Sequence, residues 1–350
     1  MTIQNKNKTS WGMRIVHSLF ILFTFFSTVW LGLAIWFQQP INSIFCNTLI
    51  GLWLLFSIAI LYFYCSQKWL KRLSIVGIYL LALSIGMLWY FNIPARSDRV
   101  WNPEVERMLS FEQHGDIVTL HNVRNFNWRT EQDYDERWET RTVDLRQLSG
   151  INVITSYWMG PQIAHTLVSF DFKNSAPITF SIEIRKEKDE AFSAIGGFFR
   201  KFELSLIAAD EKDILYTRSN IRGEQMYFFP VHMSQEKMRE LFEAYLQTSQ
   251  ELIAEPKWYN TLTSNCTTIV FDMAQSISNT KLPIDYRLLT SGYLPNYLYD
   301  LKALDNKISM YDWYLKAHVN PKTKQYSHLT SQQYSALIRQ EVQSIYVRDK

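Results

Sequence analysis

Cys266 has the surroundings of a reactive thiol. It is the only cysteine after Cys65, and it lies in Tyr259-Asn-Thr-Leu-Thr-Ser-Asn-Cys-Thr-Thr-Ile-Val-Phe271, where a loop is predicted to become a helix. The positive end of a helix dipole favours the thiolate, which is the nucleophilic form of cysteine. The alternative is a small buried apolar residue that opens a core helix.

A cysteine nucleophile needs a base for its proton and a third group that orients the base. Among the seven histidines of the chain, His165 is the one for which the sequence indicates a strand position beside a carboxylate. With Cys266 as nucleophile, His165 is the candidate base and Glu183 the candidate orienting residue. The alternative for His165 is an ordinary polar residue on a half-exposed strand face.

The placement of His165 depends on a predicted β-hairpin. Two alternating segments carry matching apolar faces, and a turn separates them at Asn174, Ser175 and Pro177. The apolar faces consist of Thr166, Val168, Phe170 and Phe172 in the first strand, and Ile178, Phe180, Ile182 and Ile184 in the second. With Phe172 opposite Ile178, His165 lies across from Arg185 and diagonal to Glu183, within reach of a long side chain.

Attack of a thiolate on a carbonyl carbon also needs donors for the oxyanion of the tetrahedral intermediate. The backbone N–H of Cys266 and the side chain of Asn265 are the candidates. Asn265 is equally well explained as the cap of the helix that follows. Arg124, Arg129 and Arg185 are candidates to bind a phosphate or carboxylate of the substrate, although surface arginines often have no such role.

The elements that hold these residues fall into two parts of different composition. Residues 1–93 contain three apolar runs long enough to span a bilayer, at Ile15 to Phe37, Ile44 to Tyr64 and Leu73 to Phe91. Residues 94–350 have the mixed composition of one sizeable soluble domain or two small ones.

Basic residues predict the orientation of the spans. They flank only one side of the predicted membrane region, at Lys6, Lys8, Arg14, Lys68, Lys71 and Arg72, and the short link Gln38 to Ser43 has no charge. The positive-inside rule then places the N-terminus in the cytoplasm and the domain from residue 94 on the outer face of the membrane.

Further elements of the outer domain follow from periodicity and capping residues. Strands are expected at Asp116 to Phe126, Glu203 to Ala208 and Gln225 to Phe229, and helices after Ser234 and from Ser331 to Val347. Gly196-Gly-Phe-Phe199 is an apolar tip that dips into lipid or, more simply, a hairpin or core entry. The expected fold class is α+β, with an antiparallel sheet and helices.

Four segments resemble the Lnb-type family of bacterial membrane proteins: Val123 to Phe126, Ala164 to Phe170, Ser181 to Arg185 and Tyr259 to Thr268. The resemblance implies a permuted papain-like (NlpC-type) domain, in which a helix presents the cysteine to a histidine on the sheet. It also implies lipoprotein N-acyl transfer at the bacterial inner membrane, with Cys266 as nucleophile and His165 as base. The implied partners are a lipoprotein or phospholipid substrate and the membrane lipid.

Two other classes of protein stay open beside the acyltransferase. One is a cysteine peptidase or amidase acting on cell-wall peptides, and the other is a membrane scaffold whose thiol is incidental. A net charge of +3 gives no reason to expect nucleic acid as a partner. Neither a Cys-x-x-Cys nor a His-x-x-x-His pair is present, so no metal or other cofactor is expected. The oligomeric state stays open.

Overall fold

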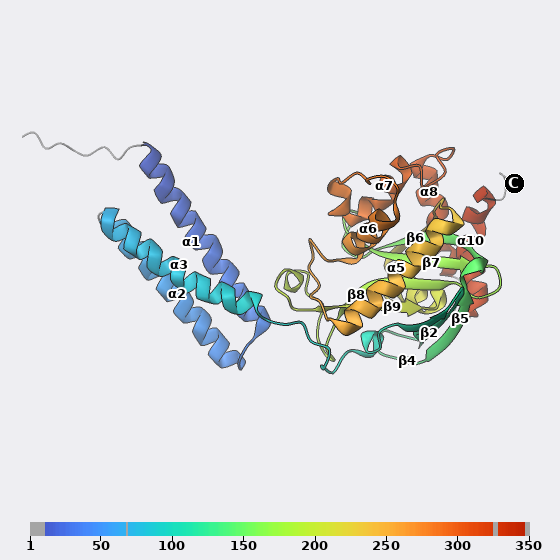
Figure 1. Ribbon diagram of the computed structural model, residues 1–350, viewed down its shortest axis with the longest axis horizontal. Helices are drawn as coiled ribbons and strands as arrows, with labels where there is room; N and C mark the ends of the chain where they lie inside the picture. The colour runs from blue at the N-terminus through green and yellow to red at the C-terminus, as the bar shows by residue number, and fades with distance from the viewer. Residues whose placement is uncertain (1–10, 68, 325–327, 347–350) are drawn as a thin grey trace, which may run out of the picture. The chain divides into compact units, whose positions relative to one another are not determined.

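The computed structural model describes residues 11–67, 69–324 and 328–346, and its chain forms two compact units (Figure 1). The first unit is Met1–Ala95 together with Ile195–Lys201, and the second is Arg96–Ala194 together with Phe202–Lys350. Three of the basic residues that predict the orientation, Lys6, Lys8 and Lys68, lie outside the described residues, as does Val347 at the end of the expected last helix.

The first unit contains three helices, each long and apolar enough to cross a membrane. They are α1 (Trp11–Gln38), α2 (Ser43–Ser66) and α3 (Trp69–Phe91). This confirms the three predicted spans. The helices meet through buried hydroxyl groups: Thr28 Oγ1 donates to Ser57 Oγ at 2.9 Å, and Trp53 Nε1 donates to the Thr28 carbonyl at 3.1 Å. Lipid tails accept no hydrogen bonds, so these polar groups are satisfied inside the bundle.

The segment Ile195–Lys201 packs against the ends of α1 and α3. Gln38, the last residue of α1, donates to the carbonyls of Phe199 and Arg200, both at 2.6 Å. Arg200 Nη1 donates to the carbonyls of Tyr90 and Phe91 in the last turn of α3, at 3.0 and 3.1 Å. The last carbonyls of a helix lack intrahelical donors, so the arginine supplies what this end of α3 needs.

The second unit is built on a mixed sheet. Its strand order is β1-β2-β9-β8-β7-β6-β10, with β5 also paired to β2. The β2–β9 pair is parallel, and the other pairs in this order are antiparallel. β3 and β4 form a separate two-stranded sheet. The strands are β1 (Ser110–His114), β2 (Ile117–Arg124), β3 (Asn127–Trp128), β4 (Tyr134–Asp135), β5 (Trp138–Asp144), β6 (Leu148–Tyr157), β7 (Ala164–Phe172), β8 (Ile178–Arg185), β9 (Glu203–Ala209) and β10 (Gln225–Pro230).

Helices accompany the sheet, which confirms the α+β class. They are α4 (Glu211–Tyr216), α5 (Gln235–Ala254), α6 (Cys266–Ile277), α7 (Leu294–Asp300), α8 (Met310–Ala317), α9 (Asn320–Thr323) and α10 (Ser331–Tyr346). Short helical turns lie at Pro103–Val105, Leu145–Gln147, Gly196–Phe198, Thr217–Ile221, Tyr286–Leu288 and Ser291–Tyr293.

The side chains that pack on one face of the sheet are apolar, and those on the other face are polar or charged. On one face Phe170 of β7 packs edge-on against Phe242 of α5, with ring centroids 5.2 Å apart, and α5 crosses the sheet in Figure 1. On the other face Ser169 donates to Glu211 of α4 at 2.5 Å, and Arg339 of α10 binds the same carboxylate at 2.5 Å. Adjacent strand residues point to opposite faces, so α5 lies over an apolar face and α4 and α10 lie over a polar one.

The β7–β8 hairpin is present, but the predicted register is wrong by two residues. Phe170, and not Phe172, lies opposite Ile178, and Leu167 lies opposite Ser181. Pro177 has no N–H for the ladder, so the connection is wider than a tight turn. A shift of two residues leaves every side chain on its predicted face. Continued to the start of β7, the observed register places His165 opposite Glu183 instead of Arg185.

Candidate active site

Cys266 is the first residue of α6, and a capping box fixes that start. Asn265 Oδ1 accepts the N–H groups of Thr267 and Thr268 at 2.8 and 2.9 Å, and Thr268 Oγ1 accepts the N–H of Asn265 at 2.9 Å. The Cys266 N–H is one of the helix-start amides that have no intrahelical acceptor, and it lies outside this box. The thiol is buried, with 7% of the residue exposed.

The same contacts bear on the two explanations for Asn265. Its Oδ1 caps the helix, and its Nδ2 donates to the carbonyl of Thr261 at 2.8 Å. The helix-cap alternative is therefore observed, while a role as oxyanion donor stays a prediction. The backbone N–H of Cys266 is the better-placed donor for an oxyanion on a carbon bonded to its own sulfur.

His165 is buried at the start of β7, and its Nε2 faces two oxygen atoms. Ser181 Oγ lies at 2.7 Å and Glu183 Oε1 at 3.2 Å, and Ser181 Oγ itself donates to Glu183 Oε1 at 2.8 Å. Nε2 is thus committed to the carboxylate side of the site. A side-chain hydrogen bond also links His165 to the Cys266 thiol, so the imidazole interacts with both the thiol and the carboxylate, as a cysteine–histidine–carboxylate site needs.

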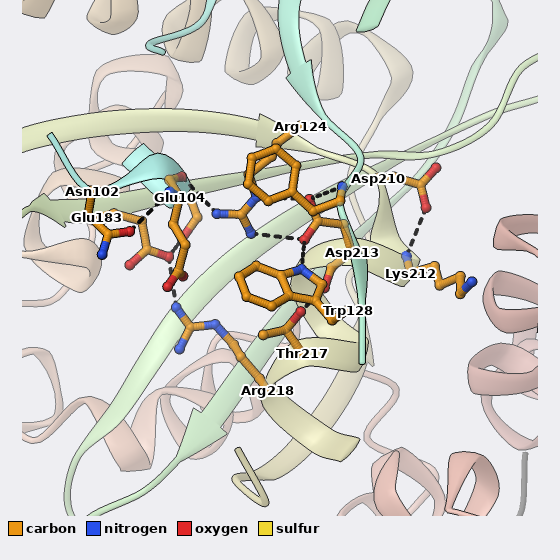
Figure 2. A network of polar contacts seen from close by, with 12 residues as sticks. Asn102, Glu104, Arg124, Trp128, Glu183, Asp210, Lys212, Asp213, Thr217 and Arg218 are labelled. Atoms are coloured by element: carbon orange, nitrogen blue, oxygen red, sulfur yellow. Dashed lines mark hydrogen bonds and ion pairs between the residues drawn. The ribbon is translucent and has the colours of Figure 1, made fainter. Parts of the chain in front are cut away.

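Arg218 extends this arrangement, and no pattern in the sequence indicates its role. Its Nη2 donates to Glu183 Oε1 at 2.7 Å, and its Nη1 donates to Glu224 Oε2 at 3.1 Å. Arg218 belongs to the π-helical turn Thr217–Ile221, and Figure 2 shows it reaching Glu183 from the segment that carries Asp213. Glu224 also accepts from Ser156 at 2.5 Å. Glu183 is therefore held on one side by Ser181 and on the other by a buried guanidinium.

Charge and burial together set the protonation of the pair. Burial lowers the pKa of His165, but the carboxylate of Glu183 together with the charge of the Cys266 thiolate and a hydrogen bond to it raises that pKa, and the net result is a pKa of about 9. Burial raises the pKa of the Cys266 thiol, but the charge of His165 and a hydrogen bond to it lower that pKa by more, so the net shift is downward. Both shifts act in the direction of a thiolate–imidazolium pair.

Two contacts align α6 on β7, one from a backbone N–H group and one between two hydroxyl groups. The N–H of Thr166 donates a hydrogen bond to the Cys266 sulfur, which also lowers the thiol pKa. Thr166 Oγ1 lies 3.0 Å from Thr267 Oγ1, so the first turn of the helix is pinned beside the strand that carries His165. The structure therefore brings together Cys266, His165 and Glu183, the three residues predicted as catalytic.

The three predicted substrate-binding arginines have partners within the protein. Arg124 is buried and forms a two-pronged ion pair with Asp213, at 2.8 and 3.2 Å (Figure 2). Arg129 is exposed and binds Asp133 and Asp135. The third, Arg185, donates to the carbonyls of Val105 and Glu106 and lies over the ring of Trp101. The guanidinium group of each arginine thus has partners within the protein in the absence of a substrate. The predicted substrate-orienting role of the three arginines stays a prediction.

An aromatic cavity of about 730 Å³ lies next to the carboxylate end of this arrangement. Glu224 is part of its wall, together with Tyr157, Tyr227 and Tyr314. Tyr157 pairs with Ala164 across the β6–β7 ladder, one residue before His165. The cavity thus lies at the end of the sheet where β7 presents the histidine.

Residues 134–292 match the family model described as the Lnb N-terminal periplasmic domain. The matched segment contains Cys266, His165, Glu183 and Arg218. No curated protein and no solved structure gives a significant match to the chain. This match supports the Lnb-type family predicted from the four sequence segments. Together with the three apolar helices, it indicates a membrane protein with an extracytoplasmic domain.

Proposed function

We propose that this chain, whose residues 134–292 match the Lnb N-terminal periplasmic domain, is a membrane-bound thiol acyltransferase. It moves an acyl chain from the diacylglyceryl group of a bacterial lipoprotein to the N-terminal amine of that lipoprotein. The observation that carries the proposal is the buried Cys266 at the start of α6, coupled to the His165–Glu183 pair. In this proposal the domain has a permuted papain-like fold, in which the histidine precedes the cysteine along the chain.

The first half-reaction forms the thioester. The thiolate of Cys266 attacks the ester carbonyl, and the resulting oxyanion accepts a hydrogen bond from the Cys266 N–H. As the carbon–oxygen bond breaks, the imidazolium of His165 protonates the departing alkoxide, which leaves as the lyso-glyceryl hydroxyl. Glu183 stabilises the imidazolium before this step and orients the neutral ring after it.

The second half-reaction consumes the thioester. The lipoprotein amine attacks the thioester carbonyl, neutral His165 accepts a proton from the attacking nitrogen, and the Cys266 thiolate leaves. The site then again holds a thiolate and an imidazolium. Burial of Cys266 helps this step, because water is kept away from a thioester that it would otherwise hydrolyse.

The function is tested on lipoproteins of cells with and without the chain. Mass spectrometry of lipoprotein N-terminal peptides is expected to show an N-acylated lyso form only in cells that express it. Two other results contradict the proposal. A diacyl form that is unchanged, with cleavage of cell-wall peptides instead, supports the amidase. No change in either substrate supports the scaffold.

The orientation in the inner membrane is proposed from Arg14, Lys71 and Arg72 together with the three basic residues outside the described part of the chain. A fusion of alkaline phosphatase after Lys350 is expected to be active, because this enzyme needs the oxidising periplasm. A fusion of β-galactosidase at the same point is expected to be inactive. The reverse pair of activities contradicts the orientation.

The pKa shifts predict the alkaline limb of the pH profile. Acylation needs the His165 imidazolium, whose pKa is raised to about 9, so kcat/KM is expected to fall as the pH rises through about 9. Glu183→Gln removes the anion that raises this pKa, so the limb moves to lower pH. Glu112→Gln, an exposed carboxylate on β1, is the control and leaves the limb in place. A limb that stays at the same pH in Glu183→Gln contradicts the assigned role of Glu183.

A further inference from the structure

Three loops of the second unit expose large apolar side chains beside the segments that carry the site. Trp158 and Met159 lie in the β6–β7 connection that precedes His165, and Leu262 lies four residues before Cys266. Phe192 lies in the segment after β8. These four residues, named the apolar rim, are 43% (Trp158), 53% (Met159), 52% (Phe192) and 49% (Leu262) exposed.

The segment that carries Phe192 contacts each of the other two loops of the apolar rim. The ring of Trp158 meets the ring of Phe192 edge-on, with centroids 6.5 Å apart. Thr261 Oγ1, next to Leu262, donates to the carbonyl of Ala194 at 3.3 Å. The segment with Phe192 therefore contacts both the loop that precedes His165 and the loop that precedes Cys266. Clustered aromatic and aliphatic side chains of this kind mark a surface that binds a partner.

Chain connectivity identifies the partner as lipid. Phe192 is three residues before Ile195, where the chain joins the unit of membrane-spanning helices. The segment that begins there is fastened to the last residues of α1 and α3 by Gln38 and Arg200. These helix ends lie at the surface of a membrane if the helices span it. Covalent connection thus keeps Phe192 within a few residues of that surface.

We propose that the apolar rim lies in the interfacial layer of the bilayer and delivers membrane-embedded substrate to the site between its loops. Tryptophan suits this layer, because its ring has an apolar body and a polar N–H. Delivery of substrate rests on the proposed function, whereas contact of the apolar rim with lipid does not depend on whether Cys266 is a nucleophile.

The test uses the full-length chain in vesicles of phosphatidylglycerol and phosphatidylethanolamine that contain a phospholipid with a photoreactive diazirine near its headgroup. After irradiation, peptide mapping by mass spectrometry is expected to find lipid adducts on the peptides with Trp158, Phe192 and Leu262, several-fold above the peptide of α8. Helix α8 is the matched control, because Tyr311 and Leu315 are exposed to 73% and 58%. Adducts on α1 to α3 verify that the reagent works.

Two double variants distinguish labelling that results from lipid contact from non-specific labelling by the diazirine. Phe192→Ser with Leu262→Ser is expected to lower labelling of the Trp158 peptide several-fold, because the neighbouring apolar anchors are gone. Tyr311→Ser with Leu315→Ser is expected to leave it unchanged. Labelling of the apolar rim at the level of α8 overturns the proposal, and so does capture of a lipoprotein polypeptide there without lipid adducts.

Discussion

Cys266→Ala is expected to abolish acyl transfer while the protein stays folded and in the membrane. Loss of a catalytic nucleophile costs roughly 10⁴-fold or more in turnover, because no other group forms the covalent intermediate. The fold tolerates the change, since the Asn265–Thr268 capping box starts α6 without help from the thiol. The measurement is the rate of N-acylated lipoprotein formation, with circular dichroism and membrane fractionation as checks on the fold.

Cys266→Ser is a sharper form of the same experiment. It keeps a nucleophile of similar shape but replaces the thiol with a hydroxyl, whose pKa is far above neutral. One imidazole does not activate a hydroxyl as it activates a thiol, so the serine variant is also expected to be close to inactive. Cys46→Ser, at a buried cysteine of α2, is the control and keeps full activity. Wild-type turnover by Cys266→Ala contradicts the thiol mechanism.

His165→Ala is expected to have an effect of similar size, roughly 10⁴-fold, because it removes both the acid of the first step and the base of the second. It also leaves the buried thiol without the cation that lowers its pKa. At neutral pH the thiol of this variant is expected to be protonated. The rate of alkylation of Cys266 by iodoacetamide at pH 7 therefore falls along with turnover, and this readout needs no substrate.

Two further variants serve as comparisons for His165→Ala. His121→Ala changes a partly exposed histidine on β2 and is expected to alter neither turnover nor alkylation. Glu183→Gln is expected to slow turnover less than His165→Ala, because it disturbs the protonation and orientation of the imidazole without removing it. An alkylation rate in His165→Ala that equals the wild-type rate contradicts the thiolate–imidazolium pair.

The parts of the fold with a regular sequence pattern were predictable from the sequence. The three apolar helices, the β7–β8 hairpin, β2, β9, β10 and the start of α5 after Ser234 all follow from periodicity and caps. The hairpin register was two residues off, because a turn that contains Pro177 has no fixed length in the sequence. The error preserved the faces, so His165 and Glu183 remained neighbours.

Other elements left no usable pattern in the sequence. β6 is buried on both faces along most of its length, so its residues do not alternate between apolar and polar. The short helix α4 and the π-helical turn after it bring Arg218 to Glu183 across 35 residues of sequence. Only the tertiary fold creates that contact. A buried arginine between two carboxylates has no local signature.

The most direct test of the thiol acyltransferase mechanism is detection of the acyl-enzyme intermediate on Cys266. Full-length protein incubated with diacylated lipoprotein whose N-terminal amine is blocked is expected to gain the mass of one fatty-acyl chain on the peptide that contains Cys266. Neutral hydroxylamine is expected to remove that mass, as it does for a thioester, and Cys266→Ala is expected to gain none. A peptidyl adduct from cell-wall fragments, with no fatty-acyl adduct from the lipoprotein, contradicts the acyltransferase and supports the amidase in its place.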